Sequence, residues 1–223
     1  MSIQDNIAAI RSHLPAQVQL VCVSKFHPEE AVREAYACGE RVFGESHVQE
    51  LCRKHDALPA DIAWHFIGHL QTNKVKYIVP FVSLIHSVDS WRLLTEIDKQ
   101  AGRTGRQVNC LLQMHIAQEE SKFGMDETEL REALERRGEL AHVTLCGLMG
   151  MATFTDDEEQ VRGEFRGLKR LFDAVKAGYF AQDDRFSVLS MGMSDDYRIA
   201  VEEGSTMVRI GTTIFGQRDY GTR

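Results

Sequence analysis

The stretch LVCVSKFHPEE, residues 20–30, combines a short apolar run, a turn and the beginning of a helix. Residues 20–23 are uninterrupted apolar side chains, which is typical of a buried strand. Pro28 suits the first turn of a helix, because its missing N–H would have no intrahelical partner there. The segment therefore predicts a strand that ends on Ser24 and Lys25 and leads directly into a helix.

This strand-helix unit recurs along the whole chain, since short apolar or β-branched runs alternate with longer amphipathic ones. The expected strands are residues 18–24, 41–44, 63–67, 84–87, 108–114, 144–149, 187–191 and 206–210. The expected helices are an N-terminal one that carries Ile3, Ile7 and Ile10, followed by residues 28–38, 47–58, 73–79, 90–100, 126–137, 156–177 and 195–203.

Eight such units predict an α/β protein with a single (β/α)8 TIM barrel and an extra N-terminal helix. An open doubly wound sheet is the competitor, but its Gly-x-Gly-x-x-Gly turn is missing. The four prolines are dispersed and no tract has the composition of a linker, so residues 1–223 are expected to form one domain.

Composition narrows the classes of function. The chain has 26 basic and 33 acidic residues and a net charge of −7, so it offers no broad attraction for nucleic acid or anionic membranes. Its five cysteines are scattered without a Cys-x-x-Cys pair, which disfavours a disulfide framework or a thiolate zinc site. No window resembles a signal peptide or a transmembrane segment. We expect a cytoplasmic protein.

Reactive groups of such a barrel lie where the strands end, because the following loops converge at one mouth. The polar or glycine-rich positions at the expected strand ends are Ser24 and Lys25, Gly44 to Ser46, His65 with Gly68 and His69, His86, Ser87 and Asp89, Met114 and His115, Met149 and Gly150, Gly192 to Ser194, and Arg209, Gly211 and Thr212.

Two of these stretches, LSMGMSDD (189–196) and STMVRIGTTIFG (205–216), supply glycines and hydroxyl side chains where barrels frequently bind phosphate. Glycine lets backbone N–H groups approach an anion, and a helix that begins at Ser194 would add its dipole. Asp195 and Asp196 must then point away from the anion. A tight turn with a helix cap is the alternative interpretation of the first stretch.

Lys25 supplies the complementary chemistry. An amine at the mouth of an apolar barrel is partly desolvated, which lowers its pKa and lets the neutral form attack a carbonyl and form a Schiff base. Combined with a phosphate site, this points to pyridoxal 5'-phosphate (PLP). Considered alone, a lysine at a strand end is more often a surface lysine, and only the accompanying phosphate loops favour the Schiff base.

Arg209 stands between Val208 and Ile210 on an expected strand, so its charge needs an acceptor near the barrel interior. The pyridine nitrogen of PLP is such an acceptor, and arginine there would leave the nitrogen largely unprotonated and weaken the ring as an electron sink. A phosphate or carboxylate clamp, or a salt bridge with Glu45 across the barrel, is the alternative.

An ordered set of motifs carries a resemblance over nearly the whole chain. They are VSKFHP, FGESHVQE, WHFIGHLQTNK, HSVD, LQMHIAQEESKFGM, CGLMGM, LSMGMSDD and GSTMVRIGTTIFG. In this order they closely resemble the YggS/PROSC family of PLP homeostasis proteins. The resemblance implies a barrel similar to the alanine racemase N-terminal domain, with Lys25 as the Schiff-base lysine. It also implies phosphate binding near Gly192, Ser194, Gly211 and Thr212, with Met193 between them, and Arg209 directed toward the pyridine nitrogen.

Two positions differ from the residues common in the family, and a third matches the family but lies outside the expected strand ends. Ser46 replaces a common asparagine, so an amide contact near the cofactor is shorter or replaced by water. His27 stands where many members have a second lysine, which puts transfer between two lysines there in doubt. Lys122 matches a family lysine, although an exposed loop charge explains it equally well.

The resemblance implies a protein that buffers or delivers PLP, with apo PLP-dependent enzymes as possible recipients, without established turnover and without a metal. We expect a monomer. One alternative is a PLP-dependent enzyme such as an amino-acid racemase that uses His65, His69 or His86 as its proton carrier. The sequence ends soon after the eighth expected strand, however, without the β domain that supplies a racemase tyrosine. The other alternative is an aldolase-type Schiff-base barrel for a phosphorylated sugar.

Overall fold

The computed structural model describes residues 2–118 and 123–217. Its eight strands are all parallel and form a closed barrel in the order β1 to β8, in which β8 pairs back onto β1. The strands are β1 (Gln19–Val23), β2 (Val42–Glu45), β3 (Ala63–Phe66), β4 (Leu84–Val88), β5 (Val108–Gln113), β6 (Val143–Met149), β7 (Val188–Ser190) and β8 (Met207–Ile210).

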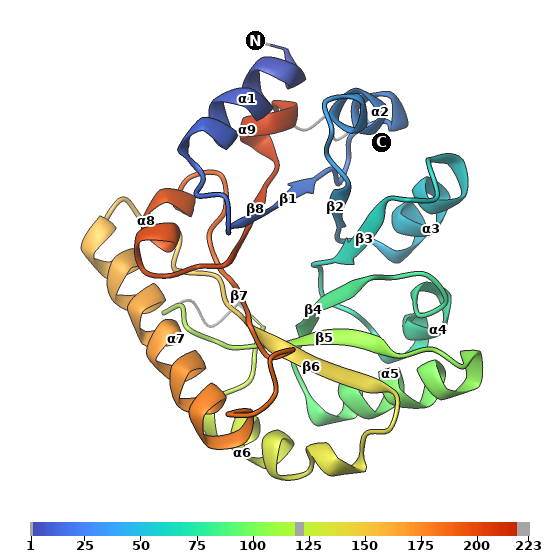
Figure 1. Ribbon diagram of the computed structural model, residues 1–223, viewed down its shortest axis with the longest axis vertical. Coiled ribbons are helices and arrows are strands. Elements are labelled where there is room, and N and C mark those ends of the chain that lie inside the picture. The colour runs from blue at the N-terminus through green and yellow to red at the C-terminus, as the bar shows by residue number, and fades with distance from the viewer. Residues whose placement is uncertain (1, 119–122, 218–223) are drawn as a thin grey trace.

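The helices surround the strands in chain order, so the blue N-terminal helix and the red C-terminal helix lie side by side (Figure 1). They are α1 (Ile3–His13), α2 (Glu29–Ala37), α3 (Val48–Ala57), α4 (Val75–Ile78), α5 (Trp91–Thr104), α6 (Glu127–Glu135), α7 (Glu158–Tyr179), α8 (Tyr197–Glu202) and α9 (Thr212–Phe215), with 3₁₀ turns η1 (Thr72–Lys74) and η2 (Arg137–Glu139). Asn6 on α1 donates its side-chain N–H to the Ile214 carbonyl of α9 at 2.9 Å, which joins the two ends of the ring.

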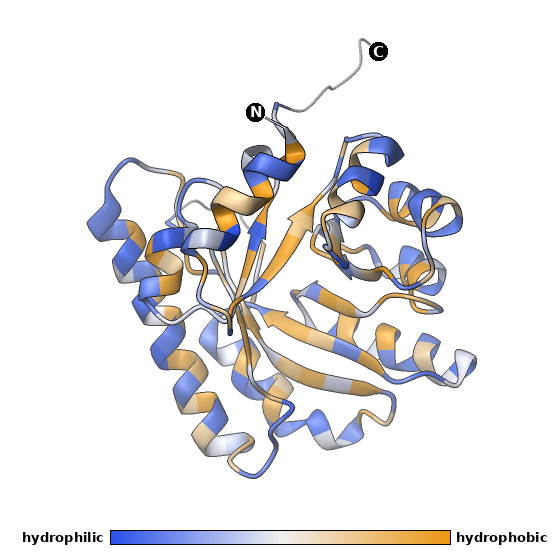
Figure 2. Cartoon of the chain, turned by 45° about the horizontal axis from the view of Figure 1, so that its top comes forward, coloured by the Kyte–Doolittle hydropathy of each residue, from blue (hydrophilic) through white to orange (hydrophobic). Residues whose placement is uncertain are grey.

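Apolar side chains fill two layers. Figure 2 shows orange strands at the centre and helices whose orange residues alternate with blue ones. The larger cluster lies between the strands and helices, and a smaller one that includes Val21, Leu111 and Met207 fills the barrel interior. Among the described residues, no helix is long and apolar enough to cross a membrane.

The predicted (β/α)8 barrel is confirmed, and all eight expected strands are present within one or two residues of their expected ends. One helix end was wrong and one helix was missed. Helix α5 continues to Thr104 because Gly102 is tolerated inside it, and Gly105 at φ +66° ends it instead. The short helix α9 was not expected, because the glycines and threonines around it resemble a loop.

The expected cap at Ser194 is also wrong. Helix α8 begins at Tyr197 with Asp196 at its N-cap position, and Ser194 bonds instead to the turn that follows β8. The expected end of this helix is confirmed, since Gly204 at φ +96° directly follows Glu203.

Candidate functional site at the barrel mouth

The ends of β1 and β8 lie next to each other at the carboxyl end of the barrel. Val21 pairs with Arg209 and Cys22 with Ile210, so both strands point to the mouth in register. A Cβ placed on Gly211 would lie 3.0 Å from the carbonyl oxygen of Val23. The turn that carries Lys25, which is half-buried, therefore lies directly beside the turn that follows β8.

The loops after β7 and β8 meet at Ser194. Its Oγ accepts long hydrogen bonds from the backbone N–H groups of Gly211 at 3.4 Å and Thr213 at 3.5 Å. Gly192 has φ +96°, and a Cβ there would lie 2.6 Å from the Cβ of Ala200. Only glycine fits at this position, because any side chain would be driven into α8 in a backbone conformation that L residues rarely adopt.

Met193 and Asp196 close the loop after β7 on itself. The Met193 N–H donates to Oδ1 of Asp196 at 2.6 Å, so this carboxylate turns back on its own loop, whereas Asp195 is exposed. Burial raises the pKa of Asp196, although the Met193 N–H and then the charge of Arg209 oppose that shift. That both aspartates point away from a bound anion stays a prediction. Thr212 is exposed at the start of α9.

Arg209 is buried inside the barrel. Its Nη1 donates to Oγ of Ser190 at 2.6 Å, and its Nη2 donates to the Gly150 carbonyl at 3.1 Å. Burial lowers the pKa of Arg209 to about 10, opposed by the charge of Asp196. The alternative of a salt bridge to Glu45 is wrong, because Glu45 faces the helix layer, where its Oε1 lies 2.7 Å from Nζ of Lys54.

A chain of polar side chains continues from Arg209 across the barrel. Nδ1 of His86 lies 3.0 Å from Oγ of Ser190, and Nε2 of His86 lies 3.0 Å from Nδ1 of His65. Burial lowers the pKa of His65 to about 4 and that of His86 well below its ordinary value, so both rings are neutral at pH 7. Because Arg209 can only donate, the assignment that gives each contact of this chain one donor and one acceptor runs from Arg209 through Ser190 and His86 to His65.

The remaining predicted residues lie around the mouth in separate places. Ser46 lies 3.2 Å from Nδ1 of His47 and lines a small cavity of about 170 Å³. His69 bonds through Nδ1 to Asp89 at 3.0 Å and stacks on the ring of Phe123.

Two further positions complete the account of the predicted residues. His27 is buried, with its ring centroid 5.1 Å from that of Phe215. Lys122 lies outside the described residues. The described part of the chain holds no group of three or more His, Cys, Asp or Glu side chains able to bind a metal.

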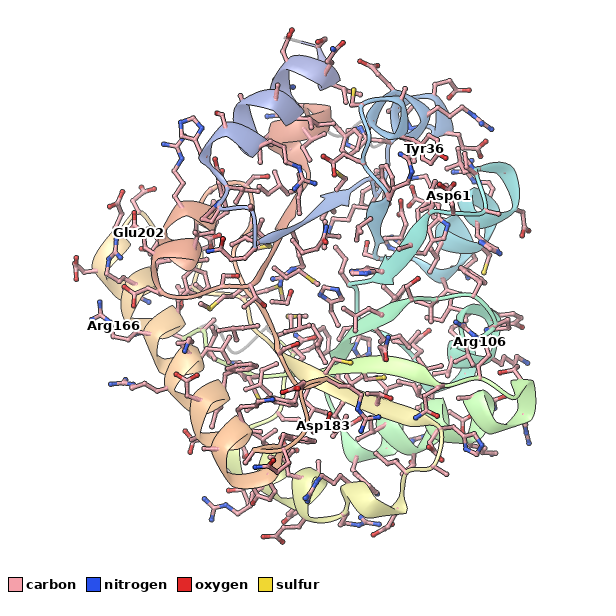
Figure 3. The ribbon with its side chains drawn as sticks, viewed as in Figure 1. Tyr36, Asp61, Arg106, Arg166, Asp183 and Glu202 are labelled. Carbon is pink, nitrogen blue, oxygen red and sulfur yellow. The ribbon has the colours of Figure 1, made fainter. Side chains whose placement is uncertain are left out.

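The sequence analysis missed the role of Lys54, which is fully buried between α3 and β2. Its Nζ donates to three oxygens, which belong to the Ser24 backbone and the side chains of Glu45 and Glu50. Charged residues in a helix ordinarily face solvent, as Arg166 and Glu202 do on the outer surface in Figure 3. Lys54 is an exception to this rule. Glu50 and Lys54 stand one helical turn apart in the sequence, and this spacing could have predicted their ion pair.

The structure is a closed (β/α)8 barrel with a lysine and an arginine at adjacent strand ends, beside glycine-lined loops. Comparison of the chain with known proteins identifies its family. Residues 1–219 match the family described as alanine racemase, N-terminal domain. The alanine racemase of Bartonella henselae superposes with a TM-score of 0.74 at 14% identity over 99% of this chain and 60% of that chain, which shows a shared fold.

Relatives of higher identity include several pyridoxal phosphate homeostasis proteins. A pyridoxal phosphate homeostasis protein of Aquifex aeolicus is 43% identical over 91% of this chain and 88% of its own length. The structure of PipY from Synechococcus elongatus PCC7942 with PLP bound is 39% identical, with a TM-score of 0.88 over 96% of this chain and 100% of that chain. The chain belongs to the pyridoxal phosphate homeostasis protein family.

Proposed function

We propose that this chain binds PLP as a Schiff base on Lys25 and serves PLP homeostasis by buffering the cofactor or delivering it. One observation carries the proposal: Gly211 packs directly on Val23, so the lysine turn and the glycine-lined turn after β8 share one corner of the mouth. PLP supplies an aldehyde for the lysine and a phosphate for the glycine-lined loops. The PLP-bound PipY relative, 39% identical, supports the same cofactor here.

The residues present fit the two ends of the cofactor. The phosphate is assigned to the loop of Gly192, Met193 and Ser194 together with Gly211 and Thr212. The long contacts from Gly211 and Thr213 to Ser194 Oγ indicate backbone N–H groups that converge on one point without a strong acceptor. Ser46 is assigned a contact through the loop after β2.

Arg209 is assigned to the pyridine nitrogen. It bonds Ser190 and Gly150 through its two terminal nitrogens, and a guanidinium has further N–H groups able to donate. These two hydrogen-bond partners are a hydroxyl and a carbonyl, and the Asp196 carboxylate acts on Arg209 through its charge without a hydrogen bond among the described residues. A donor arginine without a hydrogen-bonded carboxylate suits a neutral ring nitrogen.

We further propose that the protein acts in the cytoplasm as a single-domain monomer, without catalytic turnover, and passes PLP to apo-enzymes. The racemase alternative needs a proton carrier that is free to exchange protons near neutral pH. His65 and His86 are instead neutral, buried and bonded to each other, and His69 is paired with Asp89. Measuring interconversion of amino-acid enantiomers by the PLP-loaded protein tests this point, and turnover that vanishes in Lys25→Ala would overturn it.

The central experiment is covalent mapping of the cofactor. The purified protein is mixed with PLP, its visible absorbance is recorded, and borohydride reduction is followed by peptide mass mapping. A visible band and a reduced adduct on Lys25 are expected, and both should be absent from Lys25→Ala. Lys169→Ala is the control, because Lys169 pairs with Asp173 on the outer face of α7. An adduct on another lysine would overturn the site.

The same measurement separates the aldolase alternative. That reading predicts no visible band with PLP and a reduced adduct only with a phosphorylated sugar. Incubation with dihydroxyacetone phosphate before borohydride reduction is the direct comparison.

A further inference from the structure

We propose that Lys54, together with Glu45 and Glu50, is a positioning residue for Lys25. The inference rests on the proposed function, in which Lys25 carries PLP. It assigns a role in cofactor binding to three side chains that do not themselves lie in the barrel interior.

The ammonium group of Lys54 has its three donors fully used. Its Nζ lies 2.7 Å from the Ser24 carbonyl oxygen, 2.7 Å from Oε1 of Glu45 and 2.8 Å from Oε1 of Glu50. An ammonium has three N–H donors and no acceptor, so these three oxygens match its donors one to one. The side chain is fully buried, and its position is therefore set by these bonds.

The cluster fixes the backbone on both sides of Lys25. Lys54 binds the carbonyl of Ser24, which belongs to the peptide group before Lys25. Glu50 Oε1 also accepts the N–H of Phe26 at 2.8 Å, which belongs to the peptide group after Lys25. Both peptide planes that meet at the Cα of Lys25 are thus held by one ion-pair network from α3.

The side chain of Ser24 adds a third attachment. Its Oγ donates to Oε1 of Glu45 at 2.7 Å, which directs Ser24 toward the helix layer. The carbonyl of Ser24 also accepts the N–H of His27 at 3.1 Å, so Ser24 is the first residue of the turn that carries Lys25. The cluster therefore fixes the start of that turn, beside the proposed site.

The turn after Lys25 is strained and needs such support. Phe26 has φ +66°, a left-handed conformation that no other non-glycine residue among those described adopts. Strained backbone of this kind persists only where surrounding contacts enforce it, and it concentrates at ligand sites. Here Glu50 holds the Phe26 N–H, and the Phe26 ring lies 5.1 Å from that of His47.

The cost of burial argues against a purely structural role. Replacing buried ion pairs with well-packed apolar residues is often neutral or stabilising, so such a cluster is weak evidence of stability. This cluster touches the two residues that flank Lys25. Its charges are placed where they hold the backbone on both sides of Lys25.

The first test compares Lys54→Met with Arg106→Met. Arg106 offers a matched control, because it donates to the Val79 and Val82 carbonyls near the opposite ends of the strands, and Figure 3 shows it beside α4 and α5. The rate of PLP attachment to Lys25, trapped by cyanoborohydride and mapped by mass, should fall about tenfold or more in Lys54→Met. Arg106→Met should keep the wild-type rate whatever stability it loses.

The second test needs no cofactor. In the PLP-free protein, the Phe26 amide should exchange slowly with deuterium. Lys54→Met should accelerate that exchange by more than the loss of global stability alone would cause. Wild-type exchange in Lys54→Met would overturn the positioning role. The same would follow from a wild-type rate of attachment at Lys25 in a folded Lys54→Met protein.

A conservative pair covers the case in which Lys54→Met does not fold. Glu50→Gln keeps an oxygen acceptor for the Phe26 N–H, and Glu50→Leu removes it. Attachment at Lys25 should be near the wild-type rate in the first and slowed in the second, and equal rates would overturn the proposal. Failure of the wild-type protein to form any PLP adduct would instead remove the proposed function, while Phe26 exchange still tests the role of Lys54.

Discussion

Nη1 of Arg209 lies 2.6 Å from Oγ of Ser190, and this one hydroxyl connects a buried cation to a buried histidine. Ser190→Ala would remove the shared partner and leave both buried groups short of a hydrogen bond. Each unsatisfied group costs roughly 1–3 kcal/mol, so we expect a loss of about 2–6 kcal/mol in the free energy of unfolding. Urea denaturation measures this loss. Thr95→Ala, at an exposed helical hydroxyl, is the control, and an equal effect in both variants would contradict the prediction.

His65 predicts an acid-sensitive stability. Burial lowers its pKa to about 4 in the folded protein, from about 6.5 in the unfolded chain. Between these values the unfolded chain binds a proton that the folded protein does not, so the free energy of unfolding falls as pH drops from 6.5 to 4, by roughly 3 kcal/mol. His65→Gln should lose this part of the slope. Denaturation of both proteins at a series of pH values measures it, and parallel curves would contradict the assignment.

Glu45 predicts that stability depends on pH with the opposite sign. Burial raises its pKa to about 7, the charge of Lys54 opposes the shift and the charge of Glu50 adds to it, and its Oε2 has no hydrogen-bond partner among the described residues. The folded protein therefore holds a proton that the unfolded chain releases above about 4.5. The stability from this proton is complete below pH 4.5 and is lost as pH rises through 7.

Glu45→Gln isolates that dependence. The amide cannot ionise, so the free energy of unfolding of the variant minus that of the wild type should increase between pH 4.5 and pH 8. Denaturation across this interval is the measurement. A difference that stays constant with pH would show that Glu45 is ionised throughout.

The sequence predicted the barrel because strand composition and alternation with helices are local properties. The eight strands and the end of α8 shortly before Gly204 both follow from residues close in sequence. Ser194 was wrongly expected to cap a helix because its actual partners, Gly211 and Thr213, are about one strand-helix unit away.

Buried polar networks were harder to predict for the same reason. The sequence singled out His65 and His86 separately, but their contact depends on the register of β3 and β4 and on Ser190 from β7. Lys54 lies in a helix rich in charged residues, where only the tertiary fold shows which charge is buried. Sequence pattern therefore located the strand-end residues and missed the side chains that hold them.

Gly192 and Gly39 form a matched pair for testing the glycine-lined loop. Their φ angles are +96° and +99°, so replacement by alanine costs both the same left-handed strain of about 1–2 kcal/mol. A Cβ on Gly39 would meet nothing within 4 Å, whereas one on Gly192 would lie 2.6 Å from the Cβ of Ala200 and 2.9 Å from the Cα of Tyr197. Gly192→Ala must therefore shift the loop that carries Met193 and Ser194.

We expect Gly192→Ala to lose clearly more stability than Gly39→Ala and to bind PLP at least about tenfold more weakly, since the shift moves donors assigned to the phosphate. Gly39→Ala should keep wild-type affinity. Urea denaturation and PLP titration followed by absorbance measure the two effects separately. Equal affinities in the two variants would show that the phosphate binds away from this loop, because strain alone is common to both.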